Sequence, residues 1–298
     1  MKRIAAIDIG SNAVRMLICY VIPSGEKIIF QKNSYLRLPI RLGEDSFKDG
    51  LISNSKIHKL SNAILSFKYI MNVHDVEDYQ IYATSALRES KNHKDVIFEI
   101  KKTTGLKINI ISGLKEAKII SKGNSLEKIE FNRTFLYVDV GGGSTEFSIL
   151  RKGIEKKSKS FKIGTVRLLN NLVDETMFID IKSWLNSCLD DKDKIKLFAT
   201  GGNINKIQSM TGSKIGKPVS YLSLKDLYNT LTKYNYQERM VRFDLNPDRA
   251  DVIIPALKIF ITTMESVSSN KIFVPKVGLV DGMINEIFYE KNGNKLNS

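Results

Sequence analysis

The sequence predicts an α/β protein made of two related domains. Predicted strands alternate with predicted helices along the chain, and this alternation is typical of layered α/β domains. An Asp-x-Gly turn between two apolar runs occurs twice, in residues 8–18 and 139–149. The chain has 298 residues, of which 42% are hydrophobic, enough for two cores. We therefore expect a first domain over residues 1–125 and a second over 126–298, and we leave open whether the C-terminal helix returns to the first.

In the first half, residues 4–9 and 14–22 are apolar runs on either side of a polar turn, which predicts a β-hairpin. A helix should begin at Ser53, because apolar residues recur at helical spacing from Ile57 to Met71. The pattern then predicts a strand at 79–83, a helix at 96–104 that ends at Gly105, a strand at 106–111 and a helix from Leu114.

The second half begins with a strand at residues 134–140, which is almost wholly apolar and should be buried on both faces. A second strand follows at 146–150. We then expect a strand at 197–200, a helix opened by Ser223 with Asp226 as its capping partner, one long helix over 247–265 and a final strand at 272–274.

The repeated turn carries the first functional indication. Asp8 and Asp139 each lie in an apolar strand, where a carboxylate is costly unless a cation or ligand compensates it. Glycines after a strand let main-chain N–H groups approach an anion, and hydroxyls add donors. Asp and Gly are also ordinary turn residues, so two unrelated hairpins are the alternative. Neither turn has P-loop or Rossmann spacing, since each leads into a strand rather than a helix.

Two such loops, each beginning with an Asp, would hold a chain of phosphates and bridging Mg²⁺ ions. The formal charge of +14 agrees with a polyanionic partner, although a basic surface can serve solubility alone. The two cysteines and three histidines lack the spacing of a disulfide framework or a zinc site. The sequence contains no export signal or membrane span, so we expect a cytoplasmic protein.

Seven motifs in order along the chain resemble the exopolyphosphatase and guanosine pentaphosphate phosphohydrolase (Ppx/GppA) phosphatase family of the actin-like superfamily. They are residues 7–15 (IDIGSNAVR), 83–92 (ATSALRESKN), 111–117 (ISGLKEA), 139–146 (DVGGGSTE), 164–168 (GTVRL), 199–203 (ATGGN) and 248–252 (DRADV). The resemblance implies two RNase-H-like (actin-like) domains with an active-site cleft between them. Gly201 and Gly202 match a glycine turn that lies near the nucleotide in superfamily relatives.

The resemblance also implies roles for individual residues. Glu116 matches the glutamate that activates the attacking water, and Glu146 matches an acidic residue that positions water or metal. Metal ligands by the same comparison are Asp8, Asp139 and Glu146. The phosphate-binding residues are Ser11, Asn12, Arg15, Arg88, Gly141, Gly143, Ser144 and Thr145. By their chemistry alone, Glu116 and Arg88 would be read as surface residues.

Two positions depart from the family pattern. Lys115 stands where the family commonly has the first of two glutamates, and Val280 stands where an arginine usually follows Gly-Leu. We expect Lys115 to make the electrostatic field beside Glu116 less negative. We expect Val280 to remove a basic contact.

The resemblance implies a Mg²⁺-dependent exopolyphosphatase, in which water deprotonated by Glu116 attacks the terminal phosphorus in line. Hydrolysis of guanosine pentaphosphate by the same residues is the nearest rival function. A sugar kinase and a non-catalytic polyphosphate-binding protein are rivals from different functional classes. The four carboxylates Asp8, Glu116, Asp139 and Glu146 oppose mere polyanion binding, and nucleic acid is disfavoured as a partner. A symmetric homodimer would extend a basic groove.

Overall fold

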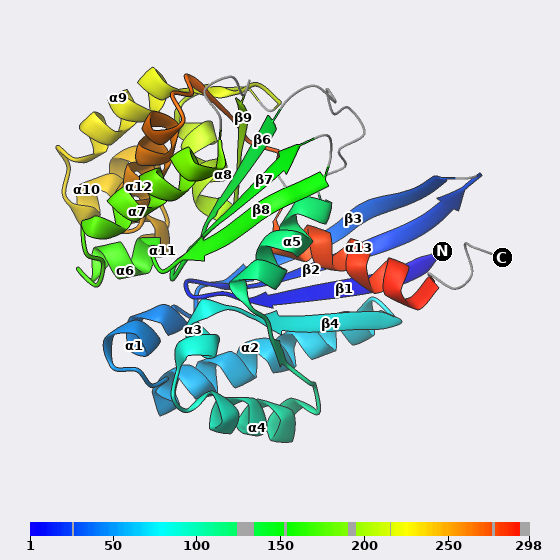
Figure 1. The fold of residues 1–298 in the computed structure, drawn as a ribbon. Coiled ribbons are helices and arrows are strands. Elements are labelled where there is room, and N and C mark those ends of the chain that lie inside the picture. The colour runs from blue at the N-terminus through cyan, green and yellow to red at the C-terminus, as the bar shows by residue number, and fades with distance from the viewer. Residues whose placement is uncertain are drawn as a thin grey trace. The chain divides into compact units, whose positions relative to one another are not determined.

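The computed structural model describes residues 1–25, 27–123, 134–151, 154–189, 195–214, 216–275 and 278–292. Two compact units make up the chain (Figure 1). The first unit comprises Met1–Gly123 with Leu279–Ser298, and the second comprises Asn124–Gly278. The boundary expected at residues 125 and 126 lies outside the described residues.

The first unit contains a five-stranded sheet in the order β3-β2-β1-β4-β5. Its central strand β1 (Lys2–Ile9) is antiparallel to β2 (Val14–Ser24) and parallel to β4 (Asp78–Ala83). The edges are β3 (Lys27–Leu38), antiparallel to β2, and the short β5 (Asn109–Ile110), parallel to β4.

The second unit repeats this arrangement in a six-stranded sheet, β10-β11-β9-β6-β7-β8. Here β6 (Thr134–Val140) is antiparallel to β7 (Thr145–Arg151) and parallel to β9 (Ile195–Thr200). The remaining strands are β8 (Ile154–Phe161), β10 (Val219–Ser220) and β11 (Lys271–Phe273). Both units thus have the strand order and directions of an RNase-H-like domain, which confirms the predicted fold class.

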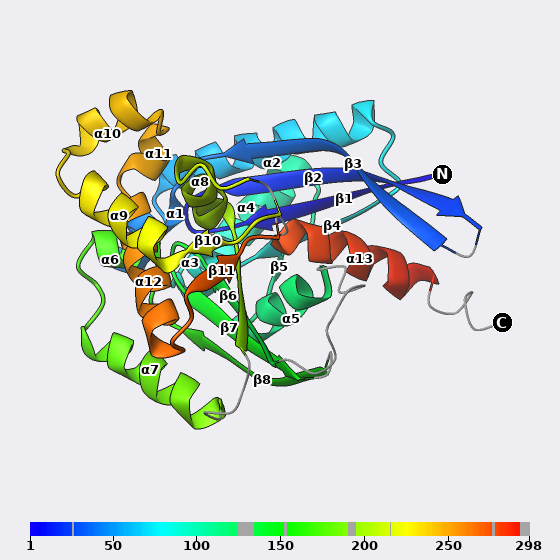
Figure 2. The same cartoon turned by 90° about the horizontal axis from the view of Figure 1, so that it is seen from above.

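Helices cover both faces of the first sheet. Because side chains alternate along a strand, Ala5, Ile7 and Ile9 of β1 enter one apolar cluster, while Ile4 and Ala6 enter another. The first cluster lies under α1 (Leu42–Lys48), α2 (Asn54–Val73), α3 (Ser85–Glu89) and α4 (His93–Thr104). The second lies under α5 (Gly113–Gly123) and α13 (Leu279–Asn292) (Figure 2).

The second unit buries one face of its sheet under a large group of helices. Leu136, Val138 and Val140 of β6 point into this core, and Phe135 and Tyr137 point to the opposite face. The helices are α6 (Thr165–Leu169), α7 (Thr176–Cys188), α8 (Gly202–Met210), α9 (Tyr221–Leu231), α10 (Tyr236–Phe243), α11 (Pro247–Ala250) and α12 (Ile253–Ser266).

Three predicted elements were wrong in detail. The strand expected at 106–111 is reduced to Asn109–Ile110, and its apolar Leu106 and Ile108 pack into the core from a loop. The cap of α9 is Ser220, which accepts the N–H of Ser223 at 3.0 Å, so Ser223 is not the cap. The long helix expected over 247–265 is two helices, α11 and α12, separated at residues 251 and 252.

Candidate active site

The turn between β1 and β2 forms the first of two matching loops, which we call loop 1 (residues 10–13). The N–H of Gly10 donates to the carbonyl of Ala13 at 3.1 Å. The carbonyls of Ser11 and Asn12 accept the N–H groups of Gly43 and Arg41 at 2.8 and 2.9 Å. The buried hydroxyl of Ser11 also lies 2.9 Å from that of Ser85, at the start of α3.

Loop 2 (residues 141–144) joins β6 to β7 with the same closing bond, from the N–H of Gly141 to the carbonyl of Ser144 at 2.9 Å. Its carbonyls face α6: Gly141 accepts from the N–H of Thr165 at 3.0 Å and Gly142 from that of Val166 at 2.9 Å. The carbonyl of Gly143 accepts from Nε of Arg167 at 2.7 Å. The Thr145 hydroxyl donates to the carbonyl of Ile163 at 2.6 Å and holds the base of the loop.

These carbonyl contacts orient the amides of both loops. In a trans peptide, the N–H points opposite to the carbonyl that precedes it. The N–H groups of Gly142, Gly143 and Ser144 therefore point away from α6, and those of Asn12 and Ala13 point away from the segment that begins at Arg41. Each loop turns amide donors outward, the arrangement that binds phosphate oxygens.

The aspartates lie at matching positions, but their partners across the ladder differ. Asp8 is 5% exposed and opposes Arg15, whose Nη1 donates to its Oδ2 at 2.7 Å. The other oxygen, Oδ1, is buried without a hydrogen bond among the described residues. Burial raises the pKa of Asp8, and the Arg15 charge only partly offsets this effect.

Asp139 instead opposes a second carboxylate, Glu146, which is 3% exposed. The two side chains place carboxylate oxygens within 4.8 Å of each other. Oδ1 of Asp139 accepts from the Thr200 hydroxyl at 2.7 Å, and Oε1 of Glu146 accepts from the hydroxyls of Ser144 and Ser160 at 2.6 and 2.8 Å. Like charges directly opposite in a sheet are destabilising, and a hard divalent cation that prefers oxygen ligands would remove the repulsion.

Two more candidate residues lie together in the first unit. Glu116 is in the first turn of α5 and is 8% exposed. Its Oε2 lies 4.0 Å from Nη1 of Arg88, at the end of α3. Arg88 also donates to the carbonyl of Ile111 at 2.8 Å, which ties α3 to the segment before α5. Glu116 is thus buried and Arg88 half-buried, whereas their chemistry alone suggests surface residues.

The sequence model of the Ppx/GppA phosphatase family matches residues 24–290. The chain belongs to this family. A bifunctional 3-dehydroquinate synthase/phosphatase of Fusobacterium nucleatum is 34% identical over an alignment of 278 positions that covers 84% of this chain and 41% of that protein. The chain thus spans about two fifths of that relative's length. A putative exopolyphosphatase of Haemophilus influenzae is 24% identical, over 87% of this chain and 83% of its own.

Solved structures of the Ppx/GppA family share the fold. The Aquifex aeolicus family member has a TM-score of 0.77 at 24% identity, over 98% of this chain and 99% of that one. An exopolyphosphatase from Cytophaga hutchinsonii has a TM-score of 0.81 at 22% identity and covers 98% of both chains.

Among the described residues, none of the helices combines the length and the apolar character that a membrane span requires.

The two departures from the Ppx/GppA pattern have structural explanations. The ammonium of Lys115 lies 3.1 Å from the hydroxyl of Tyr82 and 3.7 Å from Glu286, on α13. Lys115 therefore has a carboxylate partner other than Glu116. Val280 is buried in the apolar cluster between α13 and the sheet, so a packing contact occupies the position of the usual arginine.

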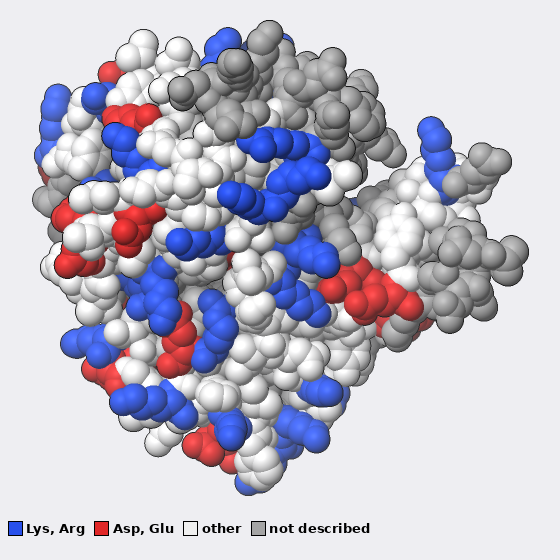
Figure 3. Space-filling view, viewed as in Figure 1, with Lys and Arg blue, Asp and Glu red and all other residues white. Residues whose placement is uncertain are grey.

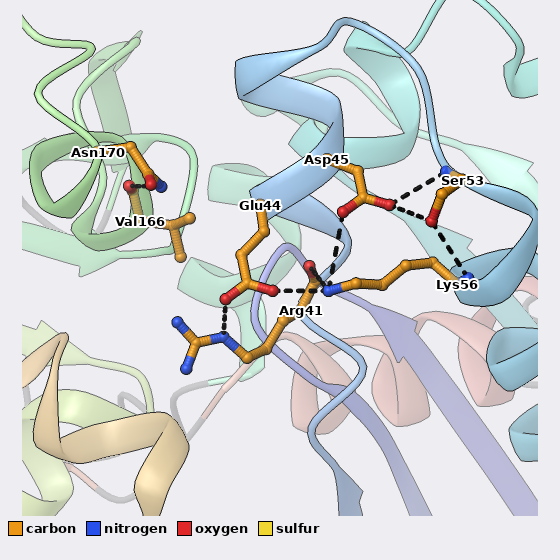
Figure 4. A network of polar contacts seen from close by, with 7 residues as sticks. All are labelled: Arg41, Glu44, Asp45, Ser53, Lys56, Val166 and Asn170. Carbon is orange, nitrogen blue, oxygen red and sulfur yellow. Dashed lines mark hydrogen bonds and ion pairs between the residues drawn. The ribbon is translucent and has the colours of Figure 1, made fainter.

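A polar network around Arg41 and Glu44 lies next to loop 1 and supports it (Figure 4). Arg41 has a left-handed backbone with a φ of 58°, a conformation rare for residues other than glycine. Its N–H donates to Asn12, and its carbonyl accepts from Nζ of Lys56 at 2.7 Å. Glu44 binds both side chains, with its Oε1 at 2.6 Å from Nε of Arg41 and its Oε2 at 2.7 Å from Nζ of Lys56. These contacts hold the strained residue that positions loop 1.

Sequence reasoning missed two arginines that support glycine turns, one at loop 2 and one at Gly201–Gly202. Arg167 binds loop 2 through Gly143, and Arg249 donates to the carbonyl of Gly202 at 2.8 Å, at a turn where Gly201 has a φ of 102°. Both lie in motifs that the sequence displayed, in residues 164–168 and 248–252. Their guanidinium groups contact main-chain carbonyls, and such contacts leave no periodic signal in a sequence.

Proposed function

We propose that this chain hydrolyses terminal phosphates from inorganic polyphosphate. The observation that carries the proposal is the duplicated hairpin, in which the loop carbonyls are hydrogen-bonded to the protein and the amides point outward, with an aspartate at the base of each loop, buried in Asp8 and half-buried in Asp139. A polyanion of repeating phosphates is the substrate class that suits two such loops.

In this proposal the loop amides bind phosphate oxygens, together with Ser11, Asn12 and Ser144, while Thr145, whose hydroxyl donates to Ile163, holds the base of loop 2. Asp139 and Glu146 would hold Mg²⁺, with Asp8 as a further ligand, since these residues offer the oxygen donors that the ion prefers. When bound, Mg²⁺ neutralises charge that develops on the transferred phosphoryl group.

Glu116 is the proposed general base that takes the proton of the attacking water. Arg88, at 4.0 Å, orients its carboxylate and would contact a phosphate oxygen. A guanidinium presents several N–H donors in a fixed plane, so one arginine can bond both the substrate and the carbonyl of Ile111. Arg15 compensates Asp8 and faces loop 1, where it would meet substrate charge.

The nearest alternative is removal of the 5′ γ-phosphate of guanosine pentaphosphate by the same residues. The Gly201–Gly202 turn is the feature that favours it, because this turn matches a glycine turn near the nucleotide in superfamily relatives and lies beside Asp139. This alternative differs from the main proposal in substrate and not in chemistry.

The deciding experiment measures phosphate release from short polyphosphate, long polyphosphate, guanosine pentaphosphate and ATP, each with and without Mg²⁺. We expect Mg²⁺-dependent release that is fastest from polyphosphate. Preference for guanosine pentaphosphate would select the alternative. Binding without release from any substrate would reject the phosphatase proposal and favour a polyphosphate-binding protein.

A further inference from the structure

Helices α5 and α13 lie side by side on one face of the first sheet, although far apart in sequence (Figures 1 and 2). Their backbones meet at Gly282, where a Cβ atom would collide with the carbonyl of Ile119. Ile119 and Ile120 of α5 pack in one apolar cluster with Val280 and Met283 of α13. The separation of the two helices is thus fixed at the middle of α5.

A polar contact joins the start of α5 to α13. The hydroxyl of Tyr82, on β4, donates to Oε2 of Glu286 at 2.9 Å and accepts from Nζ of Lys115 at 3.1 Å. The ammonium also lies 3.7 Å from Oε1 of Glu286 and 4.7 Å from the centre of the Tyr82 ring. Side-chain exposure is 16% for Glu286 and 44% for Lys115, so the carboxylate is shielded from solvent while the ammonium is partly exposed. Burial and the bond to Glu286 raise the pKa of Tyr82, which keeps its hydroxyl protonated as a donor.

Lys115 and Glu116 are consecutive residues, so their side chains leave α5 about 100° apart. Lys115 is anchored to Tyr82 and Glu286, while Glu116 faces Arg88 at 4.0 Å. With the helix separation fixed at Gly282, the Lys115 anchor sets the rotation of α5 about its axis. That rotation determines where the Glu116 carboxylate points.

We infer that Lys115, Tyr82 and Glu286 are positioning residues that hold the carboxylate of Glu116 in its working orientation. The Lys115 ammonium, which replaces a family glutamate, is matched here by a carboxylate on α13. The inference rests on the proposed function for its activity readout, because Glu116 is the proposed base. A misplacement of about 1 Å at a catalytic group can cost 100-fold in rate.

The test is a charge exchange with three variants: Lys115→Glu, Glu286→Lys and the double variant. Each single change places like charges together, and we expect kcat for polyphosphate to fall about 10-fold or more with little change in KM. The double variant restores the pair in reverse and should recover kcat to within about 3-fold. Tyr82→Phe keeps the ring and removes the bridging hydroxyl, so it should lower kcat without unfolding the protein.

Lys102→Glu is the matched control. Lys102 pairs with Glu99 on the surface of α4 at 3.9 Å, and its side chain is 69% exposed. This change alters the net charge by the same amount as Lys115→Glu. It should leave kcat unchanged, which separates an effect of the contact from an effect of the overall field on a polyanion.

Hydrogen exchange of the α5 amides gives a second readout that needs no activity. Exchange should accelerate in either single variant and return to the wild-type rate in the double variant. Wild-type kcat and exchange in Lys115→Glu and Tyr82→Phe would overturn the inference, as would single and double variants that are equally impaired. A wild-type protein that releases no phosphate would instead refute the proposed function, and exchange would still decide the inference.

Discussion

At the scale of single residues, the two hairpins place different partners opposite their aspartates, of which Asp8 is buried and Asp139 half-buried. Asp8 has an arginine across the ladder and Asp139 has a glutamate, although the loops share one backbone pattern. Arg15 supplies a positive charge beside Asp8, whereas the residue opposite Asp139 is a second carboxylate, a pair that a divalent cation would stabilise. We therefore expect the affinity for the metal to depend more on Asp139 and Glu146 than on Asp8.

Asp139→Asn tests this expectation. An amide keeps the shape of the carboxylate but supplies no charge to a hard cation, so the Mg²⁺ concentration for half-maximal activity should rise roughly 10- to 100-fold. Asp8→Asn should raise it less. A Mg²⁺ titration of phosphate release checks both, with the exposed Asp180→Asn as control. Wild-type activity of Asp139→Asn at low Mg²⁺ would make that carboxylate structural.

Asp8 also predicts a dependence of stability on pH. Because burial raises its pKa above 3.8, the folded protein holds the proton more tightly than the unfolded chain. Its contribution is present below the unfolded pKa and is lost as pH rises through the folded pKa. In metal-free buffer, the unfolding free energy of wild type relative to Asp8→Asn should be largest near pH ~3 and should decline toward neutral pH. Urea denaturation at several pH values measures this difference, and a rise with pH would contradict it.

Glu116→Gln tests the proposed base. The change preserves size but removes the basic oxygen, so turnover should fall by roughly 10²- to 10⁴-fold. Loss of a negative charge near a polyanion should leave KM unchanged or lower it. Steady-state kinetics on polyphosphate give both constants, with Glu99→Gln on the surface of α4 as control. Near-normal turnover in a folded variant would move the search for a base to Glu146.

At the scale of elements, short helices hold the loops. The five-residue α6 receives the carbonyls of loop 2 at its N–H groups, and Gly164 before it admits no Cβ, which would collide with Gly142. The segment from Arg41 does the same for loop 1. Loop conformation in this fold is therefore set by elements that follow the hairpin in sequence.

Arg167→Met tests this support. Without the guanidinium, the carbonyl of Gly143 loses the contact that turns it toward α6. Hydrogen bonds from charged groups are worth about 1.5–3 kcal/mol, so KM for polyphosphate should rise by roughly 10- to 100-fold if that energy holds the loop. Initial rates over a range of substrate concentrations give KM. Lys162→Met, which removes an exposed positive charge nearby in sequence, should change KM much less.

At the scale of the whole molecule, charge is the feature that acts beyond single contacts. Lys and Arg total 46 against 32 for Asp and Glu, and basic side chains are scattered over the face shown in Figure 3. Acidic side chains lie among them, so the basic charge of this face is spread over it and is not gathered in one patch. Such a field attracts a long polyanion more than a short one.

Binding of long polyphosphate should therefore weaken steeply with salt. A polyanion along a basic surface releases counterions on binding, so the logarithm of the affinity falls with the logarithm of salt concentration. Short polyphosphate, which contacts only the loops and metal, should show a smaller slope. Fluorescence titrations at several salt concentrations compare the two lengths. If the affinity for both lengths were independent of salt, the basic surface would have no role in binding.

The sequence alone determined the strands around each loop and the duplicated fold. The runs at 134–140 and 4–9 were readable because buried strands are continuously apolar. Strands β3 and β8 left no such signal, since they lie at sheet edges and carry exposed polar residues. The sequence also did not predict that Ser220 caps α9 or that the chain breaks between α11 and α12. Both features depend on which groups the tertiary fold brings into hydrogen-bonding range.

For the site, motifs predicted which residues matter, and tertiary structure decided the contacts that lie outside the hairpins. Asp8 and Asp139 hold equivalent positions, and the same register places the seventh following residue opposite each one, so the sequence itself supplies Arg15 in the first hairpin and Glu146 in the second. Lys115 pairs with Glu286, on a helix far away in the sequence. Arg167 donates to a main-chain carbonyl of loop 2, a contact that no sequence pattern indicates. Sequence specifies which groups are available, and only packing brings a guanidinium to a carbonyl or a carboxylate to an ammonium.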